Sequence, residues 1–295
     1  MRVLVNGPAS WNTLVALPHL PEPRPGMLTA TTWWEGLGGT SAGKALSLAR
    51  LGVPTLLRTV VGEDAAGGRV LDALRHPLLT VVAQRAPASE RHLNLMAHGD
   101  RVSVYLDAPD DPGEPPDAVA AALHDADVAV LDLAAHSVPL LERARRAGTE
   151  VWCDLHDDDG VASFHEPFRA GADVVVVSAD RLDDAWGYLA ARVAGGARWA
   201  VATRGAQGAI ALGADGRRHE VGTAHVDVVR DTNGAGDAFV AAMLTARLLG
   251  AADDEALRWG AAAGALCVAS RELVAPDLSV ERVRALAGTV EHRTV

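Results

Sequence analysis

The chain has 295 residues, of which 49% are hydrophobic, enough to bury the core of one large domain or two small ones. Its formal net charge of -11 at pH 7 argues against a general nucleic-acid binder and against a protein that binds anionic membranes, because both surfaces would repel it. Cys153 and Cys267 are too few for a disulfide framework and too far apart for a metal-ligand motif, so we expect a reducing cytoplasm.

No run of the sequence reaches the ~20 apolar residues that a membrane-spanning helix needs. The first residues, Met1–Gly7, form too short an apolar run for a secretion signal and are expected to begin with a buried strand. Lys44 is the only lysine among the 27 basic residues. We attribute this skew toward arginine to a GC-rich genome.

Short apolar runs alternate with longer Ala- and Leu-rich segments, which is typical of parallel strands separated by covering helices. Most of the runs are continuous and suited to burial on both faces. The sequence therefore predicts an α/β sandwich. The predicted strands are Val3–Asn6, Thr55–Val60, Val128–Leu131, Val151–Asp154, Val174–Ser178 and Trp199–Thr203. The predicted helices are Ser41–Leu51, Ala65–Leu74, Ser137–Ala147, Leu182–Ala194, Ala235–Leu249 and Glu255–Ala269.

Two segments break this alternation. Asn12–Gly36 contains a cluster of prolines, and Glu90–Leu106 alternates as an antiparallel hairpin that turns at Gly99-Asp100. We expect them to form a separate small sheet, from about residues 12–37 and 89–107, inserted in a single domain that spans residues 1–295. The Pro-rich stretch Pro109–Pro116 is expected to be a surface connection back into the α/β core.

The most informative segment is Asp231–Phe239, which reads DTNGAGDAF. It follows a strand-like run, His225–Val229, and opens a predicted helix. Small residues let backbone N–H groups converge on one point, and the start of the helix adds partial positive charge. The segment therefore predicts an anion hole for a transferring phosphoryl group, formed by Gly234, Ala235 and Gly236.

Asp237 lies in the first turn of that helix, beside the predicted hole. Its carboxylate could accept the proton of a substrate hydroxyl as the oxygen attacks phosphorus. The alternative is structural: Asp231 or Asp237 caps the helix and the glycines form a tight turn. The whole string, however, resembles the C-terminal signature Asp-Thr-x-Gly-Ala-Gly-Asp-x-Phe of the ribokinase (PfkB) carbohydrate kinase family.

The resemblance extends over nearly the whole chain. It implies a ribokinase-like three-layer α/β/α sandwich with a small β-sheet lid, and an ATP-dependent phosphotransferase that uses ATP and Mg2+, with Asp237 as the catalytic base. It also implies that the lid closes over the substrate, which would exclude water. Members of the family often pair through their lids, so a homodimer is a further expectation.

A second signature covers Gly38–Ala45, GGTSAGKA, near the N-terminus. In the family the glycine pair, here Gly38 and Gly39, lets the sugar approach the backbone. The family usually has Asn where this chain has Gly43, so one polar contact to the substrate is missing. Lys44 either replaces that contact or is an ordinary lysine on the helix surface. The segment also fits a P-loop, but Ala45 lacks the hydroxyl that magnesium needs.

On the nucleotide side, Thr203–Gly208 resembles the family's Thr-x-Gly-x-x-Gly turn, which implies nucleotide contacts from Thr203, Gly205 and Gly208. An ordinary turn between two strands is the alternative. ATP is expected along a groove from Gly205 to Ala263. Ser178 and Arg181 stand where the family has Asn-x-x-Glu. Ser178 is expected on the nucleotide side, and the magnesium ligands stay undetermined.

On the substrate side, Asn12 stands where the family has an acidic residue and can still hydrogen-bond a sugar. His92 and Asn94 share one face of a strand by their spacing of two, and such a face could close over a sugar or a base. A partly exposed polar strand is the alternative. The tryptophans Trp11, Trp33 and Trp34 could stack on a ring or could be core or dimer contacts.

Asp154-Leu155-His156 resembles the family's Asp-x-Asn segment near the phosphates, and the acids at 157–159 beyond it are expected to be a solvated loop. His136, His156 and His165 suggest a metal site, but their irregular spacing makes this weak.

The predicted function is phosphorylation of a hydroxyl of a small sugar or related carbohydrate. Sugar phosphates are disfavoured, because the substrate-side segments carry only Lys44, Arg91 and Arg101 as cations. A nucleoside kinase, or a non-catalytic sugar- or nucleoside-binding protein on the same fold, is the alternative. A dinucleotide-dependent oxidoreductase is disfavoured, since no Gly-x-Gly-x-x-Gly follows the first strand.

Overall fold

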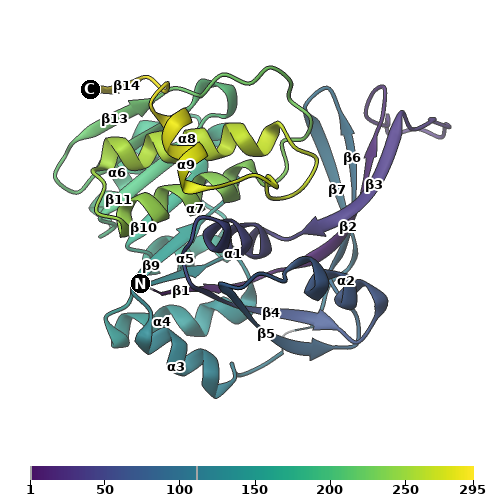
Figure 1. Ribbon diagram of the computed structural model, residues 1–295, viewed down its shortest axis with the longest axis horizontal. Helices are drawn as coiled ribbons and strands as arrows, with labels where there is room; N and C mark the ends of the chain where they lie inside the picture. The colour runs from purple at the N-terminus through teal and green to yellow at the C-terminus, as the bar shows by residue number, and fades with distance from the viewer. Residues whose placement is uncertain (1, 111) are drawn as a thin grey trace.

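A ten-stranded sheet forms the centre of the structure, a computed structural model that describes residues 2–110 and 112–295 (Figure 1). The strand order is β14-β13-β12-β11-β10-β9-β8-β1-β4-β5. Strands from β5 to β11 in this order are parallel, and β12, β13 and β14 add an antiparallel edge. The strands are β1 (Val3–Asn6), β4 (Thr55–Gly62), β5 (Leu79–Ala86), β8 (Val128–Leu131), β9 (Glu150–Asp154), β10 (Val174–Ser178), β11 (Trp199–Thr203), β12 (Ala209–Gly213), β13 (Arg218–Val221) and β14 (His292–Thr294).

Helices cover both faces of this sheet because its central strands are apolar on both sides. In β1, for example, Val3 and Val5 pack with one set of helices and Leu4 with the other. One face carries α1 (Thr40–Arg50), α2 (Ala65–Ala73), α7 (Ala235–Leu248), α8 (Asp253–Val268) and α9 (Val280–Ala287). The other carries α3 (Asp117–Asp125), α4 (Val138–Ala147), α5 (Glu166–Gly171) and α6 (Ala185–Ala194).

A second sheet stands beyond the ends of the central strands, at the right of Figure 1. Its strand order is β3-β2-β6-β7, with β2 and β6 parallel and the outer pairs antiparallel. The chain enters this small sheet directly after β1 and again after β5, so it is built over the carboxyl ends of the parallel strands. Its members are β2 (Ser10–Ala16), β3 (Thr32–Gly38), β6 (Arg91–Ala97) and β7 (Asp100–Asp107).

The predicted α/β sandwich agrees with the structure, and four of the predicted central strands have the predicted ends. The predicted hairpin is present, but it turns at His98-Gly99, one residue earlier than expected, because Ala97 pairs with Asp100 at the start of β7. The prediction that His225–Val229 is strand-like is wrong. Val228 and Val229 are exposed, and the backbone N–H groups of Arg230 and Asp231 donate to Val268 O at the end of α8 rather than to a strand. Short helices such as α5 and the edge strand β5 were not predicted, because polar residues interrupt their apolar patterns.

In the described residues, no helix is long and apolar enough to cross a membrane. Of the predicted connection Pro109–Pro116, residue 111 lies outside the described part of the chain, and the remainder is mostly exposed or half-buried.

The packing of α7 against α8 depends on a glycine. A Cβ at Gly260 in α8 would lie 2.9 Å from ring carbons of Phe239 in α7, too close without a shift of one helix. The glycine therefore determines how near the two helices can be, and α7 is the helix that begins at Asp231–Phe239.

We predict that Gly260→Ala lowers the free energy of unfolding by about 1–3 kcal/mol, because the added methyl overpacks the contact with Phe239. Gly264→Ala in the same helix is the matched control. Its Cβ would meet only Ala235 O, at an ordinary 3.5 Å, so alanine should be neutral or stabilising. Urea unfolding of the two variants measures the difference, and equal stabilities would contradict the packing argument.

Candidate active site

The polar side chains of the site come from the carboxyl ends of the parallel strands, where ligands bind in open α/β sheets. Asp132 directly follows β8, and Asp154 is the last residue of β9. The helices α1 and α7 begin at the same edge, and α7 supplies Asp237 in its first turn. Segments more than a hundred residues apart in sequence thus meet at one place.

Lys44 is the centre of this meeting point and is fully buried. Its Nζ lies 3.0 Å from Asp132 Oδ1, 3.0 Å from Asp154 Oδ2 and 2.8 Å from Asp237 Oδ1. The ammonium also donates to Thr40 Oγ1, which in turn donates to Asp237 Oδ1 at 2.5 Å. The alternative of a lysine on the helix surface is therefore wrong. Thr40 and Lys44 are four residues apart, so both point from the same face of α1.

The charges of this cluster depend on one another. Burial by itself lowers the pKa of Lys44, but the surrounding carboxylates outweigh it and raise that pKa well above its usual value. Burial also opposes ionisation of Asp154, yet Lys44 and His156 lower its pKa to about 2. Burial raises the pKa of Asp132, and Lys44 offsets this only in part. Lys44 therefore stays a cation and Asp154 an anion throughout the neutral range.

The start of α7 presents backbone donors to open space. Gly234 has φ of 78°, and a Cβ there would meet Leu273 O at 2.3 Å, so the turn requires glycine. Within the described residues 2–110 and 112–295, no acceptor bonds the N–H groups of Gly236 and Asp237. A Cβ on Gly236 would meet nothing within 4 Å. The free donors and the helix dipole together make a place for an anion.

One face of the small sheet carries buried polar atoms that have no hydrogen-bond partner among the described residues. These atoms are Ser10 Oγ, Asn12 Oδ1, Trp34 Nε1 and Asn94 Oδ1. Trp34 and Asn94 both pair in register with Leu14, and Ser10 and Asn12 precede Leu14 at even spacing, so all four share one face. A ligand with several hydroxyls could satisfy these groups, whose burial is otherwise costly.

This face is directed at the beginning of α7. Arg101 in β7 donates to Asn233 Oδ1, and Asn233 Nδ2 lies 3.3 Å from the sulfur of Met96 in β6. The guanidinium of Arg271 lies 5.3 Å from the ring centre of Trp34. The small sheet therefore closes against the loop that leads into Gly234.

Packing within the protein is a second reason for glycine at positions 38 and 39, besides the approach of a sugar to the backbone. A Cβ on Gly38 would lie 2.0 Å from Asn12 Nδ2, and one on Gly39, with φ of 90°, would lie 2.5 Å from Pro8 O. Atoms of the protein thus fill both spaces. His92 is also engaged: its Nε2 lies 2.9 Å from Glu90 Oε1.

The predicted nucleotide residues lie farther along the same edge. Thr203 ends β11 next to Ser178, which ends β10, and the two pair in register. Gly208, with φ of 84°, would place a Cβ 1.9 Å from Val221 O, so the turn requires glycine. Gly205 also has a positive φ, of 52°. Ala263 is fully buried in α8, and its predicted contact with the nucleotide stays a prediction.

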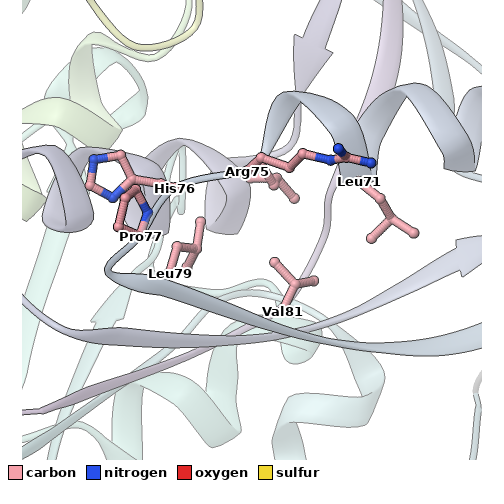
Figure 2. A pocket seen from close by; sticks show the side chains of 7 residues that line it. Leu71, Arg75, His76, Pro77, Leu79 and Val81 are labelled. Atoms are coloured by element: carbon pink, nitrogen blue, oxygen red, sulfur yellow. The ribbon is translucent and has the colours of Figure 1, made fainter.

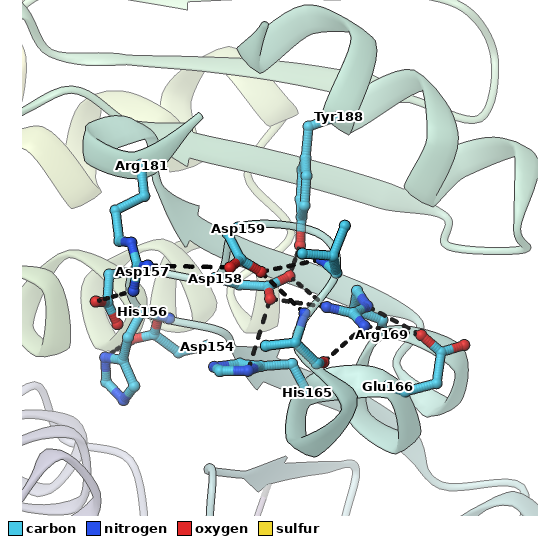
Figure 3. Close-up of polar contacts among 12 residues, drawn as sticks. Asp154, His156, Asp157, Asp158, Asp159, His165, Glu166, Arg169, Arg181 and Tyr188 are labelled. Carbon is cyan, nitrogen blue, oxygen red and sulfur yellow. Dashed lines mark hydrogen bonds and ion pairs between the residues drawn. The ribbon is translucent and has the colours of Figure 1, made fainter. Parts of the chain in front are cut away.

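The acids at 157–159 were expected to be solvated, and for Asp158 this is wrong. Asp158 is buried and accepts from Arg169 Nη1 at 2.7 and 3.0 Å and from the Tyr188 hydroxyl at 2.7 Å (Figure 3). Burial and the nearby carboxylate raise the pKa of Tyr188. This cluster holds the loop after β9, whose His156 carbonyl accepts from Ser178 N–H at 2.5 Å.

The histidines considered for a metal lie against different partners. His136 contacts Asn6 and Arg58, His156 lies beside Asp154, and His165 lies beside Asp158. In the part of the chain that the structure describes, no group of three His, Cys, Asp or Glu side chains is arranged to hold a metal ion.

A surface pocket of about 520 Å³ lies elsewhere, between α2 and the amino end of β5 (Figure 2). It contains no carboxylate and shares no residue with the site. Its lining residues are Leu71, Leu74, Arg75, His76, Pro77, Leu79 and Val81.

Sequence reasoning missed Asp132, Thr40 and Ser41. Ser41 Oγ donates to Asp132 Oδ2 at 2.6 Å, which fixes the carboxylate that Lys44 contacts. A signal for Asp132 was present: it is a polar residue immediately after a continuous apolar strand, where the carboxyl end of a parallel strand opens on a ligand site. Thr40 and Ser41 gave no such signal, since helix starts are commonly Thr or Ser.

Comparisons with known proteins identify the family. The model of the pfkB family carbohydrate kinases matches residues 12–279. An acarbose 7(IV)-phosphotransferase of Actinoplanes sp. is 32% identical over 273 residues, covering 89% of this chain and 90% of that protein. A solved microbiome-derived acarbose kinase is 28% identical, with a TM-score of 0.85 over 97% of this chain and 98% of its own.

The ribokinase of Arabidopsis thaliana, solved with ribose and ATP, is 21% identical and has a TM-score of 0.78 over 97% of this chain and 98% of its own. At that identity it supports the fold alone, and it confirms the ribokinase-like arrangement. The chain belongs to the pfkB family of carbohydrate kinases and is an ATP-dependent phosphotransferase that acts on an alcohol group of a sugar.

Proposed function

We propose that this kinase binds an uncharged sugar between the small sheet and the start of α7 and phosphorylates it with Asp237 as the base. The observation that carries the proposal is the position of Asp237: its carboxylate belongs to the same helical turn as the free N–H groups of Gly236 and Asp237. A base and an anion hole side by side are what transfer to a hydroxyl requires.

In the transfer, the acceptor oxygen forms a bond to the γ-phosphorus of ATP and the bond from that phosphorus to the bridging oxygen of ADP breaks. The hydroxyl proton passes to Asp237. The free N–H groups of Gly236 and Asp237 stabilise the charge on the phosphoryl oxygens. Of the predicted donors Gly234, Ala235 and Gly236, the N–H of Ala235 is already bonded to Thr232 O. ADP and the phosphorylated sugar then leave.

The nucleotide is proposed to lie along the ends of β10 and β11, beside Ser178, Thr203, Gly205 and Gly208. Magnesium usually keeps several waters and is held through substrate phosphates and one or two carboxylates. The lack of a preassembled metal cluster in the described residues fits a magnesium ion that arrives with ATP. When bound, this ion neutralises charge on the transferring phosphoryl group.

The small sheet is proposed to act as a lid formed by residues 12–37 and 89–107. Closure would remove water from the transfer site and limit hydrolysis of ATP. It would also place the partnerless groups of Ser10, Asn12, Trp34 and Asn94 on the sugar. Neutral amide, hydroxyl and indole groups favour a neutral polyhydroxylated acceptor.

A phosphorylated acceptor is disfavoured, because the cations expected on the substrate side already have partners. Lys44 is shared among carboxylates, Arg91 lies 3.8 Å from Asp107, and Arg101 bonds Asn233. Two relatives carry acarbose in their names, so acarbose and related oligosaccharides are the first acceptors to test beside free monosaccharides.

We predict acceptor-dependent release of ADP from magnesium-ATP with at least one compound in a panel of acarbose, free sugars, sugar phosphates and nucleosides. Asp237→Asn should lower kcat by at least ~100-fold while ATP binding persists, because the amide cannot take the hydroxyl proton. Asp72→Asn, an exposed acid in α2, is the control. Normal turnover of Asp237→Asn would exclude Asp237 as the base.

We also predict that Asn94→Ala raises KM for the acceptor by about tenfold, the effect of one lost hydrogen bond of about 1.4 kcal/mol, and leaves KM for ATP unchanged. Leu93→Ala, on the opposite face of β6, is the matched control. Steady-state kinetics with each substrate varied in turn measures both constants. Equal acceptor KM values in the two variants would remove Asn94 from the sugar site.

A further inference from the structure

The inference concerns Lys44 and rests on the proposed role of Asp237. We infer that Lys44 is a positioning residue: its buried ammonium holds Oδ1 of Asp237 so that Oδ2 faces the acceptor hydroxyl. In this arrangement the lysine contacts neither the sugar nor ATP. It determines which oxygen of the base is free and where that oxygen lies.

The two oxygens of Asp237 have different surroundings. Oδ1 accepts from Lys44 Nζ at 2.8 Å and from Thr40 Oγ1 at 2.5 Å. No donor in the described part of the chain bonds Oδ2. The side chain of Asp237 keeps 11% of its surface exposed, whereas the side chain of Lys44 keeps none. One oxygen is therefore held in place and the other is left to take a proton.

Gly43 leaves the space in which Oδ2 lies. A Cβ at this position would be 2.8 Å from Asp237 Oδ2 and 3.0 Å from its Cβ, so any side chain would press on the carboxylate. Gly43 and Lys44 are adjacent in α1, one making room beside Asp237 and the other holding it. Gly43, which stands where the family usually has Asn, and the neighbouring Lys44 thus act together on the carboxylate of Asp237.

The choice of lysine is itself informative. The chain uses arginine for every other basic position, yet the one lysine of 27 basic residues stands here. An ammonium donates in three directions from a single atom, which suits carboxylate oxygens at 2.8–3.0 Å on several sides. A planar guanidinium is larger and directs its donors in one plane. Genome composition explains the arginines but not this exception.

Other titratable groups border the cluster. His156 lies beside Asp154, with Nδ1 3.8 Å from Oδ2. Cys153 and Cys267 are buried, and burial raises the pKa of each, to about 12 for Cys267, so both thiols stay neutral in the working range. Asp132 and Asp154 are the remaining charged neighbours. Lys44 contacts all three carboxylates, and no other cation in residues 2–110 and 112–295 does so.

When the acceptor oxygen bonds to phosphorus, its proton moves to Oδ2 of Asp237 and the bond to the leaving ADP oxygen breaks. Lys44 keeps its three protons, since Asp132 and Asp154 still surround it. The proton on Asp237 returns to solvent before the next cycle. Replacement of Lys44 by an uncharged residue leaves three buried carboxylates without their cation, and such groups take up protons instead.

The test compares Lys44→Met and Lys44→Arg with the wild type and with Arg50→Met. Arg50 is a control cation in the same helix that donates to the backbone carbonyls of Val274 and Ala275. Lys44→Met should lower kcat by about tenfold or more with little change in KM for ATP. The acidic limb of its kcat profile should move up by about one pH unit or more. The Lys44→Arg variant should keep the acidic limb of its kcat profile near the pH seen in the wild type, but its kcat should be lower.

Melting temperatures supply a readout that does not need activity. Without the cation, buried carboxylates have raised pKa values, so their stabilising contribution is present at low pH and is lost as the pH rises. The difference in melting temperature between wild type and Lys44→Met should therefore widen between about pH 5 and about pH 8. The difference for Arg50→Met should change much less with pH, because Arg50 bonds backbone carbonyls and Glu272 acts on it without a hydrogen bond.

Because the chain has one lysine, 15N-lysine labelling gives one side-chain resonance, and this readout serves if Lys44→Met does not fold. The wild-type signal should be that of a solvent-protected ammonium and should shift in Asp237→Asn. A signal typical of an exposed lysine, with no shift in Asp237→Asn, would overturn the inference. A Lys44→Met variant with the kcat and the acidic limb of the wild type would also overturn it. If the wild-type protein phosphorylates no acceptor, the proposed function fails. The labelling experiment still tests whether Lys44 contacts Asp237.

Discussion

A buried ammonium surrounded by carboxylates is the interaction on which the rest of the site depends. Lys44 brings together the ends of β8 and β9 and the first turns of α1 and α7, and it has no access to solvent. Removal of one partner from a buried ion cluster is costly, because the remaining charges lose both their solvent and their counter-ion. The cluster thus fixes the relative positions of two helix starts, which is what a base beside an anion hole requires.

The topology of the chain explains why the small sheet faces the start of α7 and the carboxyl ends of the parallel strands. The chain leaves the carboxyl ends of β1 and β5 to build the small sheet, so that sheet stands over the edge where the parallel strands and α7 present their polar groups. Contacts from Arg101 and Met96 to Asn233 join the small sheet to the loop that leads into Gly234. The polar atoms that the small sheet buries without partners are on the enclosed side, where a sugar can satisfy them.

Three of the departures from the family pattern lie at two places. Gly43 lies next to Asp237, and the neighbouring Lys44 contacts the carboxylate of Asp237. Ser178 and Arg181 lie on the nucleotide side, where Arg181 Nη1 is 3.3 Å from Asp157 and the loop of Asp157 is fastened through Asp158 to Arg169. An arginine at the habitual glutamate position is thus matched by acids in the neighbouring loop.

The sequence by itself determined the α/β class, the positions of most central strands and helices and the small sheet, and it marked Asp237 as the candidate base, because apolar periodicity and a contiguous glycine-rich string are local signals. It did not determine that Lys44 is buried, that Asp158 is paired, or that Ala263 is inaccessible, and it wrongly gave His225–Val229 the character of a strand. Only the tertiary structure decided these, because burial and charge pairing depend on segments such as Asp132 and Asp154 that are distant in sequence and meet only when the parallel strands align at their carboxyl ends.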